Sequence, residues 1–229
     1  QALSALIDRG AEASVVMQGA ALPTAVLTGP DYWGYDRSAF ASAASAFTTR
    51  TDPTRAKQLL AEAKPTKPIV IGIQGSSAVH EQTANVIQAA GKALGLDIRI
   101  KVIPVEQYGN LYSDPKARAG LDAFLTTFYG NVADPLDVYA VFAAGGPSNY
   151  GDYTGVSDAV ASARSTIDPT QRAQKVIDIQ KKVEQDAPWL PLVNLPTILV
   201  QNDRITGATA SMAYLYYPWA AAIGTKGKK

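Results

Sequence analysis

The sequence predicts an α/β fold, in which helices flank a parallel or mixed sheet. Three segments have strand patterns: an apolar run at 69–73, an alternating run at 98–103 and a third candidate at 123–129. Helical patterns separate them, and the order strand, helix, strand, helix, strand is typical of βαβ units. Hydrophobic residues make up 47% of the 229 residues and charged residues 18%, which is the composition of a globular protein and not of a disordered one.

The helices are predicted from their first residues and from the spacing of their apolar side chains. Asp52 and Asp168 are each followed by a proline, and such a pair combines a capping side chain with a residue that suits the first helical turn. Pro65 ends the first of these helices, because the residue before a proline avoids helical geometry. The predicted helices cover 1–17 with an interruption near 9–10, 53–64, 77–94, 158–165 and 169–186, and further strands are predicted at 188–193 and 197–201.

The composition excludes several classes of function. The net charge is +1, without the basic excess that a nucleic-acid binder carries, so no nucleic-acid partner is expected. The chain has no cysteine, which excludes disulfides, thiolate zinc sites and cysteine nucleophiles. Its single histidine, His80, excludes a metal site built from two histidines. Gly72, Gly75 and Ser76 form no phosphate-binding loop, because no Gly-Lys-Ser/Thr follows, and we expect neither a cofactor nor a metal.

The segment 128–135 is the strongest candidate for a binding site. It follows a predicted strand and precedes a predicted helix, and ligands of α/β proteins favour the loops at the carboxyl ends of strands. The local sequence also fits a purely structural interpretation, in which Asp134 caps the helix and Pro135 starts it. The candidate ligand-binding residues of this loop are Phe128, Tyr129, Gly130, Asn131 and Asp134.

Two further hypotheses start from the same half of the chain. Asp134 and Asp137 share one side of a helix start, as the paired carboxylates of a secreted hydrolase could, but first-turn acids give the same pattern through the helix dipole. The turn-rich segment 145–151 includes Asn149, and it either lines a pocket or only connects two elements. Composition and spacing alone therefore predict a globular α/β fragment and leave enzyme and binding protein as alternatives.

Five segments carry a resemblance to a known family, in the order and spacing of that family. Residues 1–9, QALSALIDR, are similar to its RQAL-x-x-AIDR helix, and residues 52–63 are similar to DP-x-x-AK-x-LL-x-EAG. Residues 94–98 look like LGI-x-V, the loop at 128–135 resembles GW-x-x-D-x-x-D/EP, and residues 186–192 look like the APW-x-PL strand. Together they resemble the family 5 extracellular solute-binding proteins, the dipeptide- and oligopeptide-binding components of ABC importers.

The resemblance implies a periplasmic-binding-protein-like type II lobe with a mixed sheet flanked by helices, and a function without catalysis. Such proteins close two lobes on a solute and deliver it to the permease of an ABC importer. Residues 1–200 would form the second, C-terminal lobe, and 201–229 would return toward the first lobe. That lobe, a leader and any lipid anchor would lie upstream of Gln1, and the protein would work in the periplasm or at the cell surface.

The resemblance also implies roles for single residues. In peptide-binding relatives the aspartate of the W-x-x-D motif pairs with the α-amino group of the peptide, and Asn131 stands at that position, with Phe128 at the tryptophan position. Asparagine brings no charge, so a free peptide amine is disfavoured, and a sugar or another neutral solute becomes an alternative. Tyr108 stands where oligopeptide binders carry a pocket tryptophan, and no arginine stands at Leu125, near where some relatives place one for a carboxylate. Tyr108, Phe128 and Tyr129 would form walls that suit a peptide side chain or a sugar face.

Overall fold

The computed structural model describes residues 1–210 and 218–225. The α-helices are α1 (Arg9–Ala11), α2 (Arg37–Ser45), α3 (Pro53–Ala63), α4 (Ala78–Ala93), α5 (Val105–Tyr108), α6 (Pro135–Tyr139), α7 (Ser157–Arg164), α8 (Pro169–Asp186) and α9 (Trp219–Ala222). Other helical turns are the π-helix η1 (Glu12–Val16) and the 3₁₀ turns η2 (Pro30–Tyr32), η3 (Gly109–Tyr112), η4 (Pro115–Arg118) and η5 (Ala140–Phe142). The strands are β1 (Leu22–Pro23), β2 (Ile69–Gln74), β3 (Ile98–Ile103), β4 (Ala123–Phe124), β5 (Val193–Asn194), β6 (Ile205–Thr206) and β7 (Gly224–Thr225).

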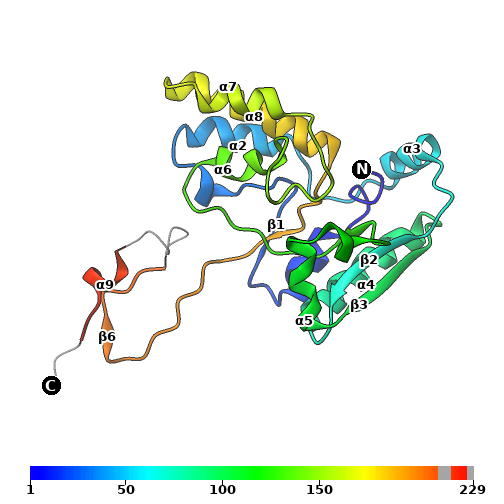
Figure 1. The fold of residues 1–229 in the computed structure, drawn as a ribbon, viewed down its shortest axis with the longest axis horizontal. Helices are drawn as coiled ribbons and strands as arrows, with labels where there is room; N and C mark the ends of the chain where they lie inside the picture. Colours follow the sequence, from blue (N-terminus) through cyan, green and yellow to red (C-terminus); the bar gives the residue numbers. More distant parts are fainter. Residues whose placement is uncertain (211–217, 226–229) are drawn as a thin grey trace.

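The predicted α/β fold is confirmed, and the central sheet is parallel. Its strand order is β3-β2-β4, and both neighbours of β2 run in the same direction as β2. Helix α4 covers one face, where Ile71 and Ile73 of β2 pack with Ile87 of the helix and with Ile7 from the N-terminal segment. The antiparallel pairs β1–β5 and β6–β7 lie outside this sheet. Figure 1 shows this α/β part beside a helical part made of α2, α6, α7 and α8.

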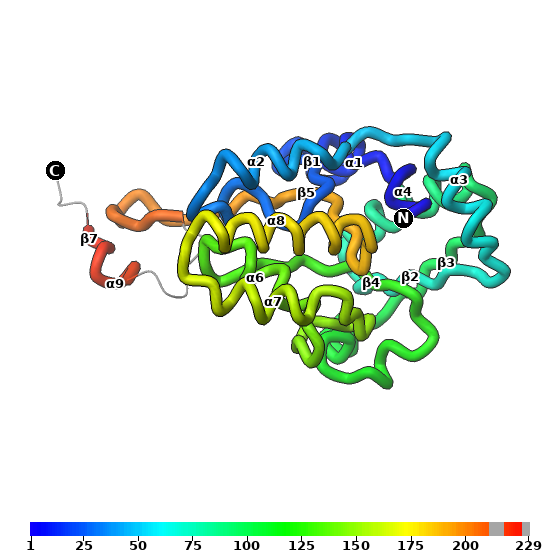
Figure 2. Tube along the Cα trace, turned by 90° about the horizontal axis from the view of Figure 1, so that it is seen from above, coloured from blue at the N-terminus to red at the C-terminus, as the bar shows by residue number. Residues whose placement is uncertain are grey.

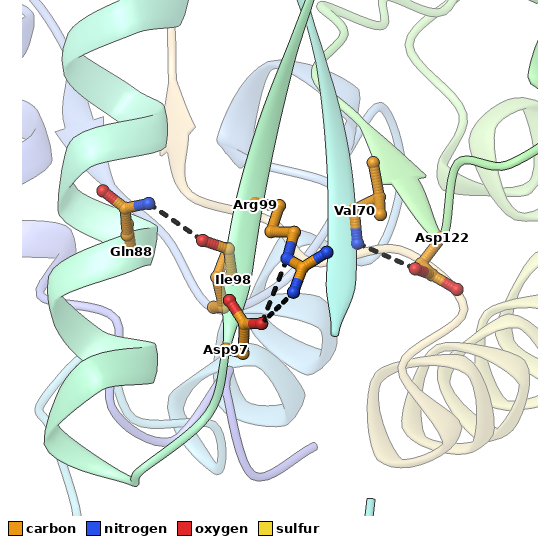
Figure 3. Close-up of polar contacts among 6 residues, drawn as sticks. All are labelled: Val70, Gln88, Asp97, Ile98, Arg99 and Asp122. Carbon is orange, nitrogen blue, oxygen red and sulfur yellow. Dashed lines mark hydrogen bonds and ion pairs between the residues drawn. The ribbon is translucent and has the colours of Figure 1, made fainter. Parts of the chain in front are cut away.

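Polar side chains hold the amino-terminal ends of the three strands (Figure 3). The Asp122 carboxylate, just before β4, accepts a hydrogen bond of 2.8 Å from the Val70 N–H of β2. Gln88 of α4 donates to the first carbonyl of β3 at 2.8 Å, and an exposed ion pair between Arg99 and Asp97 lies beside it. These contacts fix the amino-terminal edge of the sheet. The loops that follow the strands lie at the opposite, carboxyl edge.

The third strand is shorter than predicted, because β4 ends at Phe124 and not at residue 129. The Leu125 N–H still donates to the Gly72 carbonyl of β2 at 3.2 Å. The Leu125 carbonyl, however, accepts a hydrogen bond of 2.6 Å from the Tyr108 hydroxyl. The Tyr108 hydroxyl thus takes the place of a backbone N–H of β2 as the partner of this carbonyl. Residues 126–129 leave the sheet and are exposed.

The helical part has a core of its own. Helix α8 packs against α2, α6 and α7, and it buries the apolar face that the sequence predicts for 169–186. Val176, Ile179 and Val183 on that face are almost completely buried. Phe40 from α2 and Phe142 from η5 fill the space beside them. The polar side chains of α8 lie on the other side, so the predicted amphipathic helix is confirmed.

The predicted helix signals are confirmed at atomic detail. The carboxylates of Asp52 and Asp168 each accept a hydrogen bond of 2.8 Å from the backbone N–H three residues further on. Ser77 caps α4 in the same way at 3.2 Å. Helix α3 ends where predicted, and Lys64 follows it in the left-handed conformation, with φ of 43°, one residue before Pro65.

The strands predicted at 188–193 and 197–201 are wrong in extent. Only the residues of β5 form a ladder there, antiparallel with β1. The chain then leads away from the body of the molecule (Figures 1 and 2), and no strand within 1–210 and 218–225 lies beside 197–201. Ile198 and Val200 are 73% and 89% exposed. An apolar run without a partner strand remains extended and forms no sheet.

The segment expected to return toward a first lobe, 201–229, is described in part. Residues 211–217 and 226–229 lie outside the described residues. In the remainder, β6 pairs antiparallel with β7, and α9 directly precedes that second strand. This small unit stands apart from both the sheet and the helical part in Figure 2.

Candidate functional site

The candidate site lies at the carboxyl edge of the parallel sheet. The chain passes from the central strand β2 outward to β3 and then crosses to β4 on the other side. The loops that follow β2 and β4 therefore diverge, which is the arrangement at which α/β sheets bind ligands. The loop after β4 leads through 128–134 into α6, and it crosses from the α/β part to the helical part.

Hydrogen bonds from two elements fix the backbone of this loop. The Gly130 N–H donates to the Tyr32 hydroxyl at 2.8 Å, and the Asn131 N–H donates to the Asp137 carboxylate at 2.7 Å. Gly130 is buried, and a Cβ added there would lie 2.7 Å from a Tyr32 ring carbon. The side chains of Phe128 and Tyr129 are 36% and 57% exposed. The loop thus has a fixed backbone and an exposed, partly aromatic outer side.

The Asp134 side chain connects the end of the loop to neighbouring segments. Its carboxylate accepts from the Leu136 N–H at 2.9 Å, which caps α6 as the structural interpretation predicts, and from the Tyr35 hydroxyl at 3.1 Å. It also forms an ion pair with Arg172 of α8. Asp137 holds the Asn131 backbone. Both carboxylates of the hydrolase hypothesis are therefore occupied by structural contacts. Both residues line a hollow of about 200 Å³ that is also lined by Arg164 and Arg172.

Tyr108 lies in the protein interior. Its side chain is 3% exposed, and its hydroxyl donates to the Leu125 carbonyl, so it offers no open face to a solute and instead fixes the start of the loop. Burial raises the pKa of the Tyr108 hydroxyl well above its usual range. The neighbouring His80 accepts a hydrogen bond of 3.1 Å from the Gln74 N–H. Burial lowers the pKa of His80, which therefore remains a neutral acceptor at pH 7.

Asn149 closes a loop between η5 and α7. Its amide accepts from the Tyr153 N–H at 2.9 Å and donates to the Ala143 carbonyl at 3.3 Å and to the Tyr153 carbonyl at 2.5 Å. These bonds satisfy the amide within its own loop. The side chain next to it, Tyr150, points to the sheet edge instead, where it packs on Phe124 with 5.2 Å between the ring centroids.

Sequence reasoning missed most of a continuous row of aromatic rings. Tyr150 stacks on Trp189, with the ring planes 11° apart and the centroids 6.1 Å apart. Phe128 meets the same Trp189 edge-on at 5.2 Å, and Tyr112 packs against Tyr150 at 6.1 Å. The rings come from η3, β4, the 128–134 loop, the 143–153 loop and the segment after α8, so no local spacing could reveal them. We call this row the aromatic strip: Tyr112, Phe124, Phe128, Tyr150 and Trp189.

No metal-binding group stands among these residues. Within 1–210 and 218–225, no cluster of three or more His, Asp or Glu side chains has the geometry to hold a metal ion. The same part of the chain contains no helix with the length and the apolar run that crossing a bilayer requires. The loop and the aromatic strip offer exposed aromatic side chains and the amide of Asn131.

Comparison with known proteins decides the family. Residues 1–150 match the family model described as bacterial extracellular solute-binding proteins, family 5 Middle. The chain belongs to family 5 of the bacterial extracellular solute-binding proteins. The resemblance indicated by the sequence motifs is thereby confirmed. Members of family 5 are binding proteins that work outside the cytoplasm, and the family serves solute uptake by ABC transport. The comparison with curated proteins gives no match.

Solved structures of other binding proteins share the fold of this family 5 chain. They include NikA from Staphylococcus aureus in complex with Ni(L-His)2, with 23% identity and a TM-score of 0.70 over 93% of this chain. OppA from Burkholderia pseudomallei has 16% identity and a TM-score of 0.74 over 99%, and DppA from Helicobacter pylori in complex with the peptide STSA has 19% and 0.73 over 99%. The chain spans 44%, 45% and 43% of these three proteins, which is less than half their length. At such identities the likeness shows the fold, which is that of a type II periplasmic binding protein.

Proposed function

We propose that residues 1–200 form the second lobe of the peptide-binding component of an ABC importer, which captures a solute between two lobes and delivers it to a membrane permease. The observation that carries the proposal is the arrangement of the loop at 128–134 beside the aromatic strip. In a family 5 chain, a loop with a fixed backbone presents exposed aromatic side chains at the carboxyl edge of a parallel sheet, beside the aromatic strip. Such a surface can enclose a solute once a second lobe closes over it.

The proposed first lobe would meet the segment that leads away from the body. Leu195, Ile198 and Val200 are exposed there, and contiguous apolar side chains in an extended segment favour contact with another part of a protein. We propose that 201–229 returns toward that lobe, and that the two-lobed protein is anchored at the outer side of the membrane as a lipoprotein.

The site residues take two roles in this proposal. Phe128, Tyr129 and Asn131 face the solute, since their side chains are exposed on the outer side of the loop. Gly130 and Asp134 shape the loop, and Tyr108 and Asn149 hold the segments on either side of it. Asn131 is uncharged, which favours peptides whose amino group is blocked or bound elsewhere. A sugar is the second candidate solute, because the stacked rings of the aromatic strip also suit a pyranose face.

Calorimetry tests the capture between two lobes. The chain alone and the chain joined to its first lobe are titrated with di-, tri- and tetrapeptides and with cello-oligosaccharides. We expect binding by the two-lobed protein only, because half of the enclosing surface is absent from the single lobe. Sub-micromolar binding by the chain alone would contradict the two-lobe proposal. If the two-lobed protein bound oligosaccharides and no peptide, the solute would be a sugar and not a peptide.

Substitution tests the role of Asn131. In the two-lobed protein, Asn131→Asp is expected to improve the binding of peptides with a free amine by about tenfold, because a carboxylate can pair with the ammonium. Gln58→Glu on the exposed side of α3 adds the same charge away from the site and is the matched control. An unchanged preference between free and N-acetylated peptides in Asn131→Asp would count against this role.

A further inference from the structure

Strand β3 forms an open edge of the parallel sheet. It pairs with β2 on one side, and no other strand within 1–210 and 218–225 pairs with it. The carbonyls of Asp97 and Ile103 accept hydrogen bonds from the first residue of β2 and from the residue just after β2. In a parallel ladder every second residue turns its N–H and C=O toward the same neighbour. The backbone groups of Ile98, Ile100 and Val102 therefore point away from β2.

Only the first part of this edge is covered. Gln88 of α4 donates to the Ile98 carbonyl at 2.8 Å, and Figure 3 shows this side chain beside the amino-terminal end of β3. Among the described residues, no hydrogen bond reaches the outward N–H and C=O groups of Ile100 or Val102. Val102 is 63% exposed. These two residues thus offer the row of backbone donors and acceptors to which a further strand can add.

A groove of about 270 Å³ lies beside the two open residues, between β3 and α4. Its apolar wall includes Ile73, Ile100 and Val102, and its polar wall includes Glu81 and Asn85 of α4. Side chains of an added strand that lie on the same face as Ile100 and Val102 would enter this groove. The apolar wall favours apolar side chains there, and the carboxylate of Glu81 disfavours acidic ones.

The opposite face of β3 is positively charged. Lys101 is exposed there, and it forms no ion pair within the described part of the chain. Arg99 lies on the same face but is paired with Asp97 at 2.8 Å. Side chains of an added strand on this face would lie beside Lys101, where an acidic side chain is favoured.

A second copy of the chain does not suit this edge. In the antiparallel register that pairs Ile100 of one copy with Val102 of the other, the two Lys101 side chains would lie directly opposite each other. Like charges at such positions are destabilising. The charge of the edge therefore favours a partner of different sequence.

We infer that β3 binds an extended segment of a partner protein in which apolar and acidic side chains alternate. The segment adds to the sheet through the backbone groups of Ile100 and Val102, with its apolar side chains in the groove and its acidic side chains beside Lys101. Main-chain hydrogen bonds provide affinity in this mode, and alternate side chains provide specificity. Strand β2 separates β3 from β4 and the loop that follows it, so the inference does not rest on the proposed function.

The test titrates blocked peptides against the two-lobed protein. The probe is N-acetyl-Val-Glu-Val-Glu-Val amide. One control replaces both glutamates with lysine, and the other, N-acetyl-Val-Val-Glu-Glu-Val amide, has the same composition without the alternation. We expect the probe to bind at least about fivefold more tightly than either control. Hydrogen exchange measured by mass spectrometry locates the site, and bound probe should slow exchange in 98–103 and leave 126–132 unchanged.

Two substitutions separate the charge from the backbone. Lys101→Glu should reverse the preference, so that the lysine peptide binds more tightly than the probe. Lys57→Glu on the exposed side of α3 makes the same change away from β3 and should leave the preference unaltered. Val102→Pro removes an outward N–H that the ladder with β2 does not use, and it should weaken probe binding by at least about fivefold.

The outcomes also separate this inference from the proposed function. Equal affinities for the three peptides, no binding of any of them, or an unchanged preference in Lys101→Glu would overturn it, and the charges of Lys101 and Arg99 would then only protect the edge from association. Slower exchange in 126–132 without slower exchange in 98–103 would also overturn it, because the probe would then occupy the solute site. The proposed function would stand after any of these results, since titration with free peptides and oligosaccharides tests it.

Discussion

Glu184, at the end of α8, is expected to make the stability of this lobe depend on pH. Its carboxylate accepts a hydrogen bond of 2.8 Å from the Leu27 N–H and another of 2.8 Å from the Tyr139 hydroxyl. The buried Arg9 lies within Coulombic range, and these three groups favour the charged form. Burial outweighs them and raises the pKa of Glu184 from 4.5 to about 7. Glu184→Gln keeps an oxygen for both donors and removes the charge at every pH.

The magnitude follows from the change in pKa. Each tenfold change in proton affinity is equivalent to about 1.4 kcal/mol, so a pKa raised from 4.5 to about 7 corresponds to ~3 kcal/mol. Between these two values the folded chain keeps a proton that the unfolded chain has lost, so the free energy of unfolding falls as the pH rises through this window. The ~3 kcal/mol cost is absent below pH 4.5 and complete above pH 7.

Urea denaturation followed by tryptophan fluorescence, from pH 4.5 to 8, measures this effect. We expect Glu184→Gln to be as stable as the wild type at pH 4.5 and more stable by up to ~3 kcal/mol at pH 8. Burial also raises the pKa of Glu12, so the Glu184→Gln variant keeps a pH dependence of the same sign, and adding Glu12→Gln is the control that removes it. A pH dependence that is identical in wild type and Glu184→Gln, or a variant less stable at pH 8, would refute the reasoning.

Three further substitutions test the local geometry. Lys64→Gly should raise the free energy of unfolding by about 1 kcal/mol in urea denaturation, because Lys64 has a left-handed φ of 43° that glycine adopts without strain. Gly130→Ala should lower the melting temperature and weaken solute binding, at a cost of about 1–3 kcal/mol, since its Cβ would lie 2.7 Å from the Tyr32 ring. Tyr108→Phe should cost about 1–3 kcal/mol in the same denaturation assay, because the Leu125 carbonyl loses its partner; an unchanged midpoint would show that water replaces the hydroxyl.

The helices could be predicted because their signals are local. An aspartate followed by proline at 52 and 168, and a serine at 77, act on backbone groups two or three residues away, and the structure has each of these caps. The predicted 1–17 helix is less accurate: residues 2–6 form turns, and regular helix begins only at Arg9. Arg9 is 3% exposed and donates to the Pro191 and Ser4 carbonyls, so long-range contacts determine the path of that segment.

The strands show where local signals fail. The strands β2 and β3 were predicted almost to the residue, because each has a neighbour along its whole length. The runs at 125–129 and 197–201 have similar propensity, yet one loses its ladder to the Tyr108 hydroxyl and the other has no neighbour among the described residues. Strand formation depends on a partner that may come from anywhere in the chain, and propensity cannot supply it.

The same distinction explains which site residues the sequence could reveal. The order strand, loop, helix is local, and it correctly located the 128–134 loop at the sheet edge. Which side chain faces outward is decided by contacts between distant segments: Tyr32 holds Gly130 from 98 residues away, and Arg172 holds Asp134 from 38 residues away. Asn149 was a candidate as part of the turn-rich segment 145–151, yet its amide is used within its own loop, and it is Tyr150 that reaches Trp189.

The fixed backbone of this loop bears on how the site would work. Family 5 proteins need not rearrange a loop to select a solute if its carbonyls, N–H groups and rings are already in place, since little conformational freedom is then lost on binding. Here Gly130 and Asn131 are each held by one hydrogen bond, and Asp134 by an ion pair, before any solute arrives. Specificity would then reside in the side chains that project from this loop: Phe128, Tyr129 and Asn131. A change of solute preference would require substitutions at those positions and not at Gly130 or Asp134, whose loss should weaken the binding of every solute alike.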